Sequence, residues 1–350
     1  MKKIGLVYLS VVIGIAIILA SVVPINNKFA QASTIVDTSS SDEIRGAMLD
    51  YVGIETFDEF DEYNSDILSH ISRSNQSSSW ALNRIQANRA WQMTTGSEYI
   101  KVGVLDTGID GSHPALRNLI HPNLELHRCF FHAPNHPNRH NAALVDWNGH
   151  GTPMAGKIAS EFPNIGVAKN IRLVSLRVLD ANGNGDLGLI AQAVKHAQDH
   201  GMHILNASLS GASAGGQGYI NLRDALRNFN GLFVAAAGNR GINIDDRPDY
   251  PASFAHRRYS FGNVISVGST NMHDARHDWS ERFLGILVNR RGSNFGIETV
   301  CVFAPGQDIV TTARGGGEML ARVGTSIAAP FVAGTAALMM SVNSNFEINY

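Results

Sequence analysis

The feature that most constrains the fold is a tight loop that leads directly into a long apolar segment near the carboxyl end. Residues 324–330 read Gly-Thr-Ser-Ile-Ala-Ala-Pro, and the segment from Phe331 to Met340 carries no charge. This pattern predicts a buried helix that begins at a small-residue turn. Ser326 would lie at the amino end of that helix, where the helix dipole favours negative charge. A chain of 350 residues with 44% hydrophobic content can bury such a helix in a large core.

Three other motifs hold the groups that a serine nucleophile needs. A short apolar, β-branched run over 101–105 leads into Asp106, His150 stands in Asn-Gly-His-Gly-Thr, and Asn239 closes Ala-Ala-Ala-Gly-Asn. A serine hydroxyl is a weak nucleophile that needs a base, and the base needs an acid to orient it. Each residue alone also fits a cap or a loop position. Together they would supply the nucleophile, the base and the orienting acid that acyl transfer through a serine requires.

The four motifs resemble those of the subtilisin-like serine proteases, the subtilase or peptidase S8 family, over roughly residues 80–342. The resemblance implies that Ser326 attacks the scissile carbonyl, that His150 takes and returns the proton, and that Asp106 orients the imidazole. It also implies that the Asn239 amide and the Ser326 backbone N–H bind the oxyanion. Some extracellular proteases of this type remove leader peptides from bacteriocins, so a bacteriocin leader peptidase is one candidate subtype.

Strand and helix patterns alternate along the chain after residue 80. This alternation predicts a doubly wound α/β fold, with a mostly parallel sheet and helices on both faces. The predicted strands cover residues 101–105, 171–178, 203–206, 231–237 and 264–268. Predicted helices cover 151–160 and 187–200, in addition to the one that begins at Ser326. Family members usually continue for a few dozen residues beyond that last helix, so the domain is expected to be incomplete at its carboxyl end.

The substrate is expected to be a protein or a peptide. The extended edge along which the family aligns a substrate backbone corresponds to Ser208, Leu209, Ser210 and Gly211. A loop after Asn239 leads to a Tyr-Pro pair at 250–251 that lines the P1 pocket in the family, and Asp249 directly precedes this pair. Two alternatives are open for Asp249. Its carboxylate lies near the pocket floor and favours Lys or Arg at P1, or it points to solvent beside Arg247.

The amino-terminal region predicts export from a bacterial cell. Two lysines precede an uncharged run from Ile4 to Val23, and Ala-Gln-Ala follows at 30–32, as in a signal peptide. The run is also long enough to span a bilayer, so residues 1–32 form either a cleaved signal or a transient membrane anchor. Residues 33–79 are polar and acidic with a serine-rich end, which predicts a short pro-segment and linker before a protease domain at 80–350.

A preference for a basic P1 residue would let the enzyme cut its own chain between Arg73 and Ser74, just before the serine-rich linker. Exposed linkers of this kind are the usual sites of proteolytic nicking. The protein is then expected to be made as a zymogen and to act as a secreted or surface-exposed protease of a bacterium.

Composition narrows the remaining functions. The 28 basic and 30 acidic side chains give a net charge of -2, so no concentrated basic face for nucleic acid is expected. Cys129 and Cys301 are the only two cysteines and are expected to be independent thiols. Five of the 14 histidines lie between His121 and His140, where prolines oppose a helix that could align zinc ligands. A solvated insertion loop is expected there. We expect a monomer without a cofactor or assigned metal site, with structural calcium left open.

Two rival classes compete with the protease. An α/β-hydrolase esterase would need Gly-x-Ser-x-Gly and a histidine as the last triad member, whereas Ser326 lies in Thr-Ser-Ile-Ala and is itself last. A degenerate protease that acts as a surface binding module would carry the same motifs as an active enzyme. Only the reactivity of Ser326 separates this second alternative from a protease.

Overall fold

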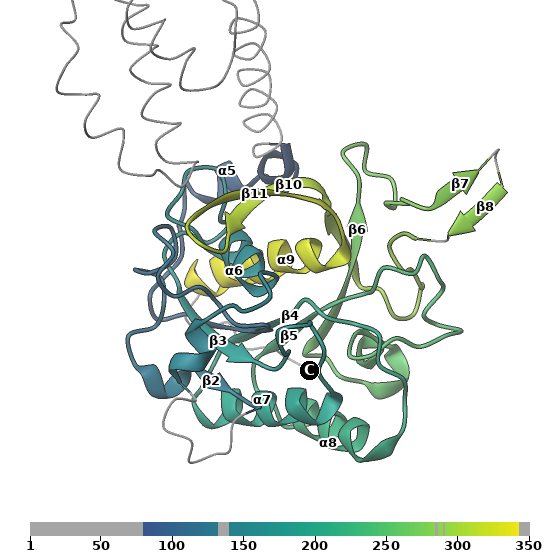
Figure 1. The fold of residues 1–350 in the computed structure, drawn as a ribbon, viewed down its shortest axis with the longest axis horizontal. Coiled ribbons are helices and arrows are strands. Elements are labelled where there is room, and N and C mark those ends of the chain that lie inside the picture. The colour runs from purple at the N-terminus through teal and green to yellow at the C-terminus, as the bar shows by residue number, and fades with distance from the viewer. Residues whose placement is uncertain (1–79, 132–139, 284–285, 290, 343–350) are drawn as a thin grey trace, which may run out of the picture. The chain divides into compact units, whose positions relative to one another are not determined.

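A seven-stranded sheet forms the centre of the domain (Figure 1). The computed structural model describes residues 80–131, 140–283, 286–289 and 291–342, so the expected export signal and pro-segment lie outside the described residues. Neighbouring strands pair in parallel throughout the sheet, in the order β2-β3-β1-β4-β5-β6-β9. The strands are β1 (Lys101–Asp106), β2 (Arg128–Cys129), β3 (Arg172–Arg177), β4 (Ile204–Ala207), β5 (Leu232–Ala236), β6 (Val264–Thr270) and β9 (Val302–Pro305).

Helices cover both faces of this sheet, because side chains that alternate along each strand are apolar on both sides. Val102 and Val104 of β1 pack in the cluster that contains apolar side chains of two helices on one face. Leu105 packs in a second cluster with apolar side chains of two helices on the other face. The first pair is α6 (Gly151–Ile158) and α9 (Thr325–Val342), and the second is α7 (Leu187–Asp199) and α8 (Gly216–Arg227) (Figure 1).

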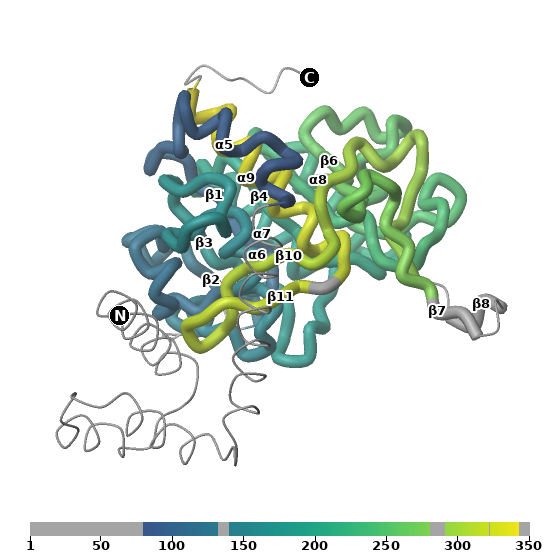
Figure 2. Tube along the Cα trace, turned by 90° about the horizontal axis from the view of Figure 1, so that it is seen from above, coloured from purple at the N-terminus to yellow at the C-terminus, as the bar shows by residue number. Residues whose placement is uncertain are grey.

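Helix α9 is the buried helix that the apolar carboxyl-terminal segment predicts. Among the described residues, it is the one helix with the length and apolar composition to cross a membrane, but 61% of it is buried inside the protein. It packs against α6 and against β4, β5 and β6, with the hairpin of β10 (Gln307–Ala313) and β11 (Gly317–Val323) beside α6 (Figure 2). Its residues therefore form part of the core of a globular domain.

The remaining elements are short. They are α5 (Ala87–Ala90), the hairpin of β7 (Glu281–Phe283) and β8 (Ile286–Asn289), and the 3-10 helices η1 (Leu124–Leu126), η2 (Asn141–Leu144), η3 (Ala252–Ala255) and η4 (Arg257–Tyr259). The expected doubly wound α/β fold is confirmed, and the five predicted strands end within about two residues of the observed ones. Sequence patterns did not reveal α8, β9 or the two hairpins, which depend on the packing around them.

The expectation of a solvated loop between His121 and His140 is wrong for residues 126–130, whereas residues 122–125 are exposed as expected. Residues 128–129 form β2 at the edge of the sheet, and His127 beside it is fully buried. Its Nδ1 accepts the Ser175 N–H at 3.0 Å, and its Nε2 donates to the His121 carbonyl at 2.8 Å. These bonds satisfy the ring, so it can occupy the core. Residues 132–139, which include His132 and His136, lie outside the described residues, so a zinc site that used them stays untested.

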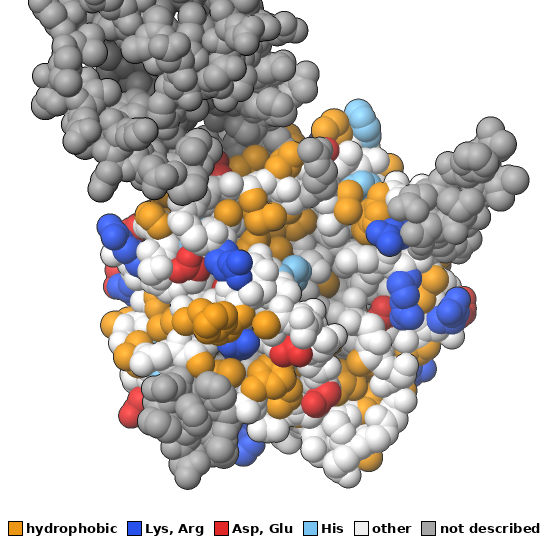
Figure 3. Space-filling model, in the orientation of Figure 1, with side chains coloured by type: hydrophobic (Ala, Val, Ile, Leu, Met, Phe, Trp, Pro, Cys, Tyr) orange, Lys and Arg blue, Asp and Glu red, His pale blue; other side chains and the backbone are white. Residues whose placement is uncertain are grey.

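Two features of composition can be placed on the structure. Cys129 is buried and Cys301 is exposed, and both are free thiols as expected. On the face of the molecule seen in Figure 3, acidic and basic side chains are interspersed, with apolar groups between them.

Candidate active site

The carboxyl end of β1 places a buried carboxylate beside a histidine. Asp106 is the last residue of β1 and is fully buried, and His150 immediately precedes α6. His150 Nδ1 lies 2.8 Å from Oδ1 and 3.0 Å from Oδ2 of Asp106. An ionised carboxylate only accepts hydrogen bonds, so Nδ1 carries the proton and Nε2 is left as the basic nitrogen. The charge of Asp106 raises the pKa of His150 above its ordinary value, against the opposing effect of burial.

Gly151 allows this approach. A Cβ at this position would lie 2.0 Å from the Gly108 carbonyl oxygen and 3.1 Å from the Asp106 side chain. The His-Gly pair therefore brings the start of α6 against the loop that follows β1 more closely than any other residue type would permit.

Asp146 is a second buried carboxylate at this site, and the sequence did not identify it. Its oxygens accept hydrogen bonds from the Thr107 hydroxyl, the Gly149 N–H, and both the N–H and the hydroxyl of Thr152, at 2.7 to 2.9 Å. These bonds tie the loop before α6 to the loop after β1. The negative charge of Asp146 also contributes to the raised pKa of His150. A signal was present in hindsight, since an aspartate four residues before a histidine in a turn can satisfy the amides of that turn.

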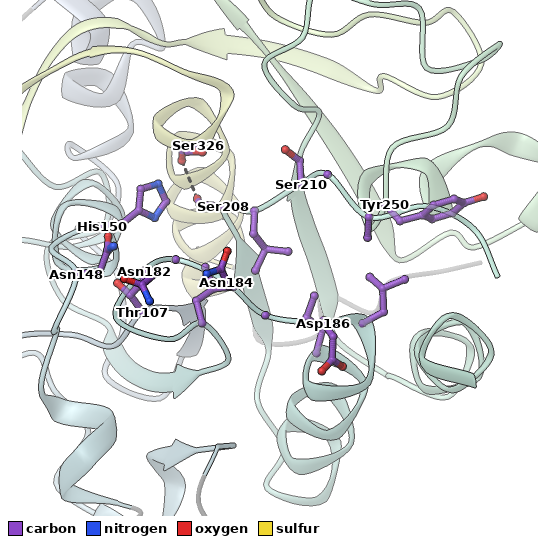
Figure 4. Close-up of a pocket in the computed structure, with 18 residues that line it drawn as sticks. Thr107, Asn148, His150, Asn182, Asn184, Asp186, Ser208, Ser210, Tyr250 and Ser326 are labelled. Carbon is purple, nitrogen blue, oxygen red and sulfur yellow. Dashed lines mark hydrogen bonds between the residues drawn. The ribbon is translucent and has the colours of Figure 1, made fainter. Parts of the chain in front are cut away.

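Ser326 reaches the site from the opposite side. It is the second residue of α9 and is partly exposed, whereas Thr325 before it is fully buried. His150 and Ser326 line the same pocket, and Figure 4 shows them at the same end of it. Tertiary packing thus brings together an aspartate, a histidine and a serine that lie 44 and 176 positions apart in the chain.

Asn239 follows β5 and faces the start of α9. Its Oδ1 accepts the Thr325 N–H and the Thr325 hydroxyl, both at 2.9 Å. These two donors fix the orientation of the amide and leave Nδ2 directed away from Thr325. A Cβ built on Gly324 would lie 3.9 Å from Asn239 Nδ2 and 3.7 Å from the Ser326 nitrogen. The absence of a side chain at Gly324 therefore leaves open the space next to these two donors.

The pocket in front of these residues has a volume of about 440 Å³. One wall is the segment that includes Ser208, Leu209, Ser210 and Gly211, as the resemblance implies, and Tyr250 extends this wall (Figure 4). The opposite wall is the loop 182–187, which the sequence did not single out. Its asparagines and glycines border the pocket together with Asp186 and Leu187.

The surroundings of Asp249 exclude one of the two alternatives drawn from the sequence, the one in which its carboxylate points to solvent. It is 1% exposed and accepts a hydrogen bond from the Gly211 N–H at 2.6 Å. Its Oδ2 lies 3.0 Å from the Arg240 guanidinium and 3.1 Å from Asn294 Nδ2, and a Cβ on Gly238 would come within 2.7 Å of it. The carboxylate is thus held between the substrate-edge segment and the segment before Asn239. It does not point to solvent beside Arg247, and its charge is already paired with Arg240.

No group of three or more His, Cys, Asp or Glu side chains is arranged to hold a metal ion within the described ranges. The acidic loop 180–186 lies near the pocket, but Asp180 and Asp186 there accept backbone N–H groups of their own loop and of α7.

A parallel α/β sheet, a histidine held by an aspartate, a serine at the same pocket as that histidine and an amide beside the start of the serine's helix are typical of the subtilisin-like serine proteases. Comparison with known proteins supports this class. The model of the Peptidase S8 family, described as the subtilase family, matches residues 97–349. The chain belongs to the subtilase family.

Individual relatives show the extent of the similarity. The chain is 32% identical to subtilisin Savinase of Lederbergia lenta over 278 residues, which covers 78% of this chain and 87% of that protein. It is 33% identical to the alkaline elastase YaB of a Bacillus strain over 271 residues, 77% of this chain and 61% of the relative. An intracellular serine protease of Paenibacillus polymyxa is 33% identical over 270 residues, 75% of this chain and 73% of the relative.

Among solved structures, a cold-adapted subtilisin-like serine proteinase superimposes with a TM-score of 0.55 and 27% sequence identity, covering 71% of this chain and 78% of that one. The chain spans 56% to 62% of the length of three relatives. They are the alkaline elastase, a thermophilic serine proteinase of a Bacillus strain and an alkaline protease of Alkalihalobacillus alcalophilus.

Proposed function

We propose that the protein is a serine endopeptidase in which Asp106, His150 and Ser326 form the catalytic triad. The observation that supports this most directly is that His150, held through Nδ1 by the buried Asp106 carboxylate, opens on the same pocket as Ser326. The Ser326 hydroxyl attacks the peptide carbonyl while His150 Nε2 takes its proton. The Asp106 carboxylate stabilises the imidazolium that forms.

The oxyanion that develops on the carbonyl accepts hydrogen bonds from Asn239 Nδ2 and from the Ser326 N–H, which border the same space. The C–N bond then breaks as His150 gives its proton to the leaving amine. Water, activated by His150 in turn, hydrolyses the acyl-enzyme and restores the serine. Because His150 acts as a base only when it is neutral, and because Asp106 raises its pKa, activity is expected at neutral to alkaline pH.

An active-site phosphonate and a casein substrate test this proposal. The wild type should be labelled and should hydrolyse casein, and Ser326→Ala should abolish both. Ser341→Ala is a matched control, since Ser341 lies on the same helix and its hydroxyl donates to the Ala337 carbonyl of that helix. Unlabelled wild type of normal fold would instead favour the binding module. Labelling that persists in Ser326→Ala would refute the assignment of the nucleophile.

For the P1 pocket, we propose that Asp249 and Arg240 act as a pair. A Lys or Arg at P1 can use the Asp249 carboxylate only by competing with the guanidinium that already neutralises it. The Arg240 side chain is 53% exposed, whereas Asp249 is 1% exposed, so the arginine can move and the carboxylate cannot. A preference for basic P1 residues is therefore weaker with Arg240 in place than the carboxylate alone would produce.

Matched peptides with Arg or Phe at P1 test this pair. Arg240→Gln should raise the ratio of kcat/KM for Arg to that for Phe, because the buried carboxylate then needs another cation. The double variant Arg240→Gln with Asp249→Asn should reverse that rise. Arg257→Gln provides a control at another exposed arginine, one whose ion pair is with Glu298. An unchanged ratio in Arg240→Gln would remove the pair from specificity.

We also propose export by way of residues 1–32 and self-processing at Arg73–Ser74, both of which rest on the sequence. Self-processing requires an arginine at P1, so the peptide assay bears on it first. Amino-terminal sequencing of the secreted protein should find Ser74 first in the wild type, with the pro-segment kept in Ser326→Ala. The same first residue in both proteins would exclude self-processing. Retention of both proteins inside the cell would refute export.

A narrower substrate proposal is the leader peptide of an exported bacteriocin, which rests on the family resemblance alone. Faster cleavage of a leader-containing precursor than of casein would support it, and equal rates would oppose it. We further propose that the protein acts as a monomer, which sedimentation at working concentration tests.

A further inference from the structure

The nucleophile lies in a helix turn that lacks one of its own hydrogen bonds. In an α-helix the carbonyl of residue i accepts the N–H of residue i+4. For Ser326 that residue is Pro330, which lies inside α9 and has no N–H. The carbonyl of the nucleophile's own residue therefore cannot receive its regular helical partner.

A hydroxyl from another part of the chain occupies this position. Ser208 Oγ donates to the Ser326 carbonyl at 2.7 Å, across 118 positions of sequence (Figure 4). Ser208 is 2% exposed and begins the segment 208–211 that lines the substrate pocket. One buried hydroxyl thus joins the backbone of the nucleophile to the wall along which a peptide would bind.

Asn206 fixes the direction of this hydroxyl. It lies on β4, is fully buried, and its Nδ2 donates to Ser208 Oγ at 2.9 Å. A hydroxyl has one hydrogen, and Ser208 uses it on Ser326, so Ser208 must accept from Asn206. Among the described residues, the buried Asn206 Oδ1 has no hydrogen-bond partner. The Asn206 amide thus occupies the acceptor side of the Ser208 hydroxyl and leaves its hydrogen for the Ser326 carbonyl.

We propose that Ser208 is a positioning residue that replaces the N–H missing at Pro330 and holds Ser326 in its attacking position, with Asn206 directing the hydroxyl. This inference rests on the proposed function, in which Ser326 is the nucleophile. The side chain of Ser208 acts through the Ser326 backbone and does not touch the reacting atoms. Its loss should therefore slow the chemical step more than it weakens substrate binding.

A double-mutant cycle with Pro330 tests the proposal. Ser208→Ala should lower kcat about tenfold with little change in KM, because a displacement of the nucleophile by a fraction of an ångström slows its attack. It should slow phosphonate labelling of Ser326 by a similar factor. Pro330→Ala restores an N–H that can donate to the Ser326 carbonyl, so Ser208→Ala should lower kcat by less than about twofold in the Pro330→Ala background. Ser208→Thr keeps the hydroxyl and should retain most of the wild-type kcat.

Three results would overturn the proposal: an equal loss from Ser208→Ala in both Pro330 backgrounds, an effect confined to KM, or equal losses for Ala and Thr at position 208. Circular dichroism and thermal unfolding identify variants that fail to fold. If the Pro330→Ala background does not fold, the comparison of Thr with Ala decides. If wild type is not labelled by the phosphonate, the proposed function fails. If wild type and Ser208→Ala are labelled at the same rate, the proposed function stands and this inference fails.

Discussion

Acidification should unfold this protein through a histidine that the fold buries in its neutral form. His127 is fully buried, with Nδ1 accepting the Ser175 N–H and Nε2 donating to the His121 carbonyl. A proton on Nδ1 would break the first bond and place a charge in the core. Burial accordingly lowers the pKa of His127 from 6.5 to about 4; the hydrogen bond to the His121 carbonyl opposes this shift, and the charges of His121 and His140 add to it.

The size of the effect follows from linkage. Between pH 4 and pH 6.5 the unfolded chain binds a proton at this site and the folded chain does not, so stability rises with pH in this window and is lost as pH falls through it. Each pKa unit corresponds to about 1.4 kcal/mol, so His127 should remove about 3 kcal/mol of stability between pH 7.5 and pH 4. Burial also lowers the pKa of His196 to about 4, so His196 should further reduce the free energy of unfolding as the pH falls.

Urea unfolding at several pH values between 4 and 8 measures this loss. Ser326→Ala should be used throughout to prevent self-digestion. His127→Gln offers the matched variant, because a glutamine amide can accept from Ser175 and donate to His121 but does not titrate. Between pH 7.5 and pH 4, the free energy of unfolding of His127→Gln should decrease by about 3 kcal/mol less than that of the Ser326→Ala parent. His273→Gln, at an exposed histidine, is the control. The same pH dependence in His127→Gln and its parent would refute the reasoning.

Three further predictions concern charge and the oxyanion. Lys157 is fully buried and burial lowers its pKa to about 7, so the free energy of unfolding of the wild type should increase between pH 7 and pH 10. Lys157→Met should raise the free energy of unfolding at pH 7 by about 2 kcal/mol and should flatten its increase with pH. A lower free energy of unfolding for Lys157→Met at pH 7 would contradict this. Asp146→Asn removes a charge that raises the pKa of His150, so the acidic limb of the pH profile of kcat/KM should move to lower pH. An acidic limb at the same pH in both proteins would contradict an effect of Asp146 on His150. Asn239→Ala should lower kcat about 10²- to 10³-fold with KM nearly unchanged, a range taken from an oxyanion asparagine of a subtilisin. A decrease in kcat of less than tenfold would exclude Asn239 as a main hydrogen-bond donor to the oxyanion.

Short-range patterns in the sequence were enough to predict the strands and the buried helix, and the order of the motifs is read directly from the sequence. The apolar run before Asp106 predicted β1, and the small-residue turn before Phe331 predicted the start of α9, because these features depend on a few neighbouring residues. The same patterns located candidate triad residues, since strand ends and helix starts are where an α/β fold exposes side chains.

Only the tertiary structure decided which distant groups meet. The pairing of Asp249 with Arg240, and the bond from Ser208 to the carbonyl of Ser326, join residues that no local pattern relates. The burial of His127 likewise depends on β2 lying at the sheet edge beside β3, which composition did not indicate. A side chain's charge state and partners are set by its surroundings in space, and those surroundings come from segments far apart in the chain.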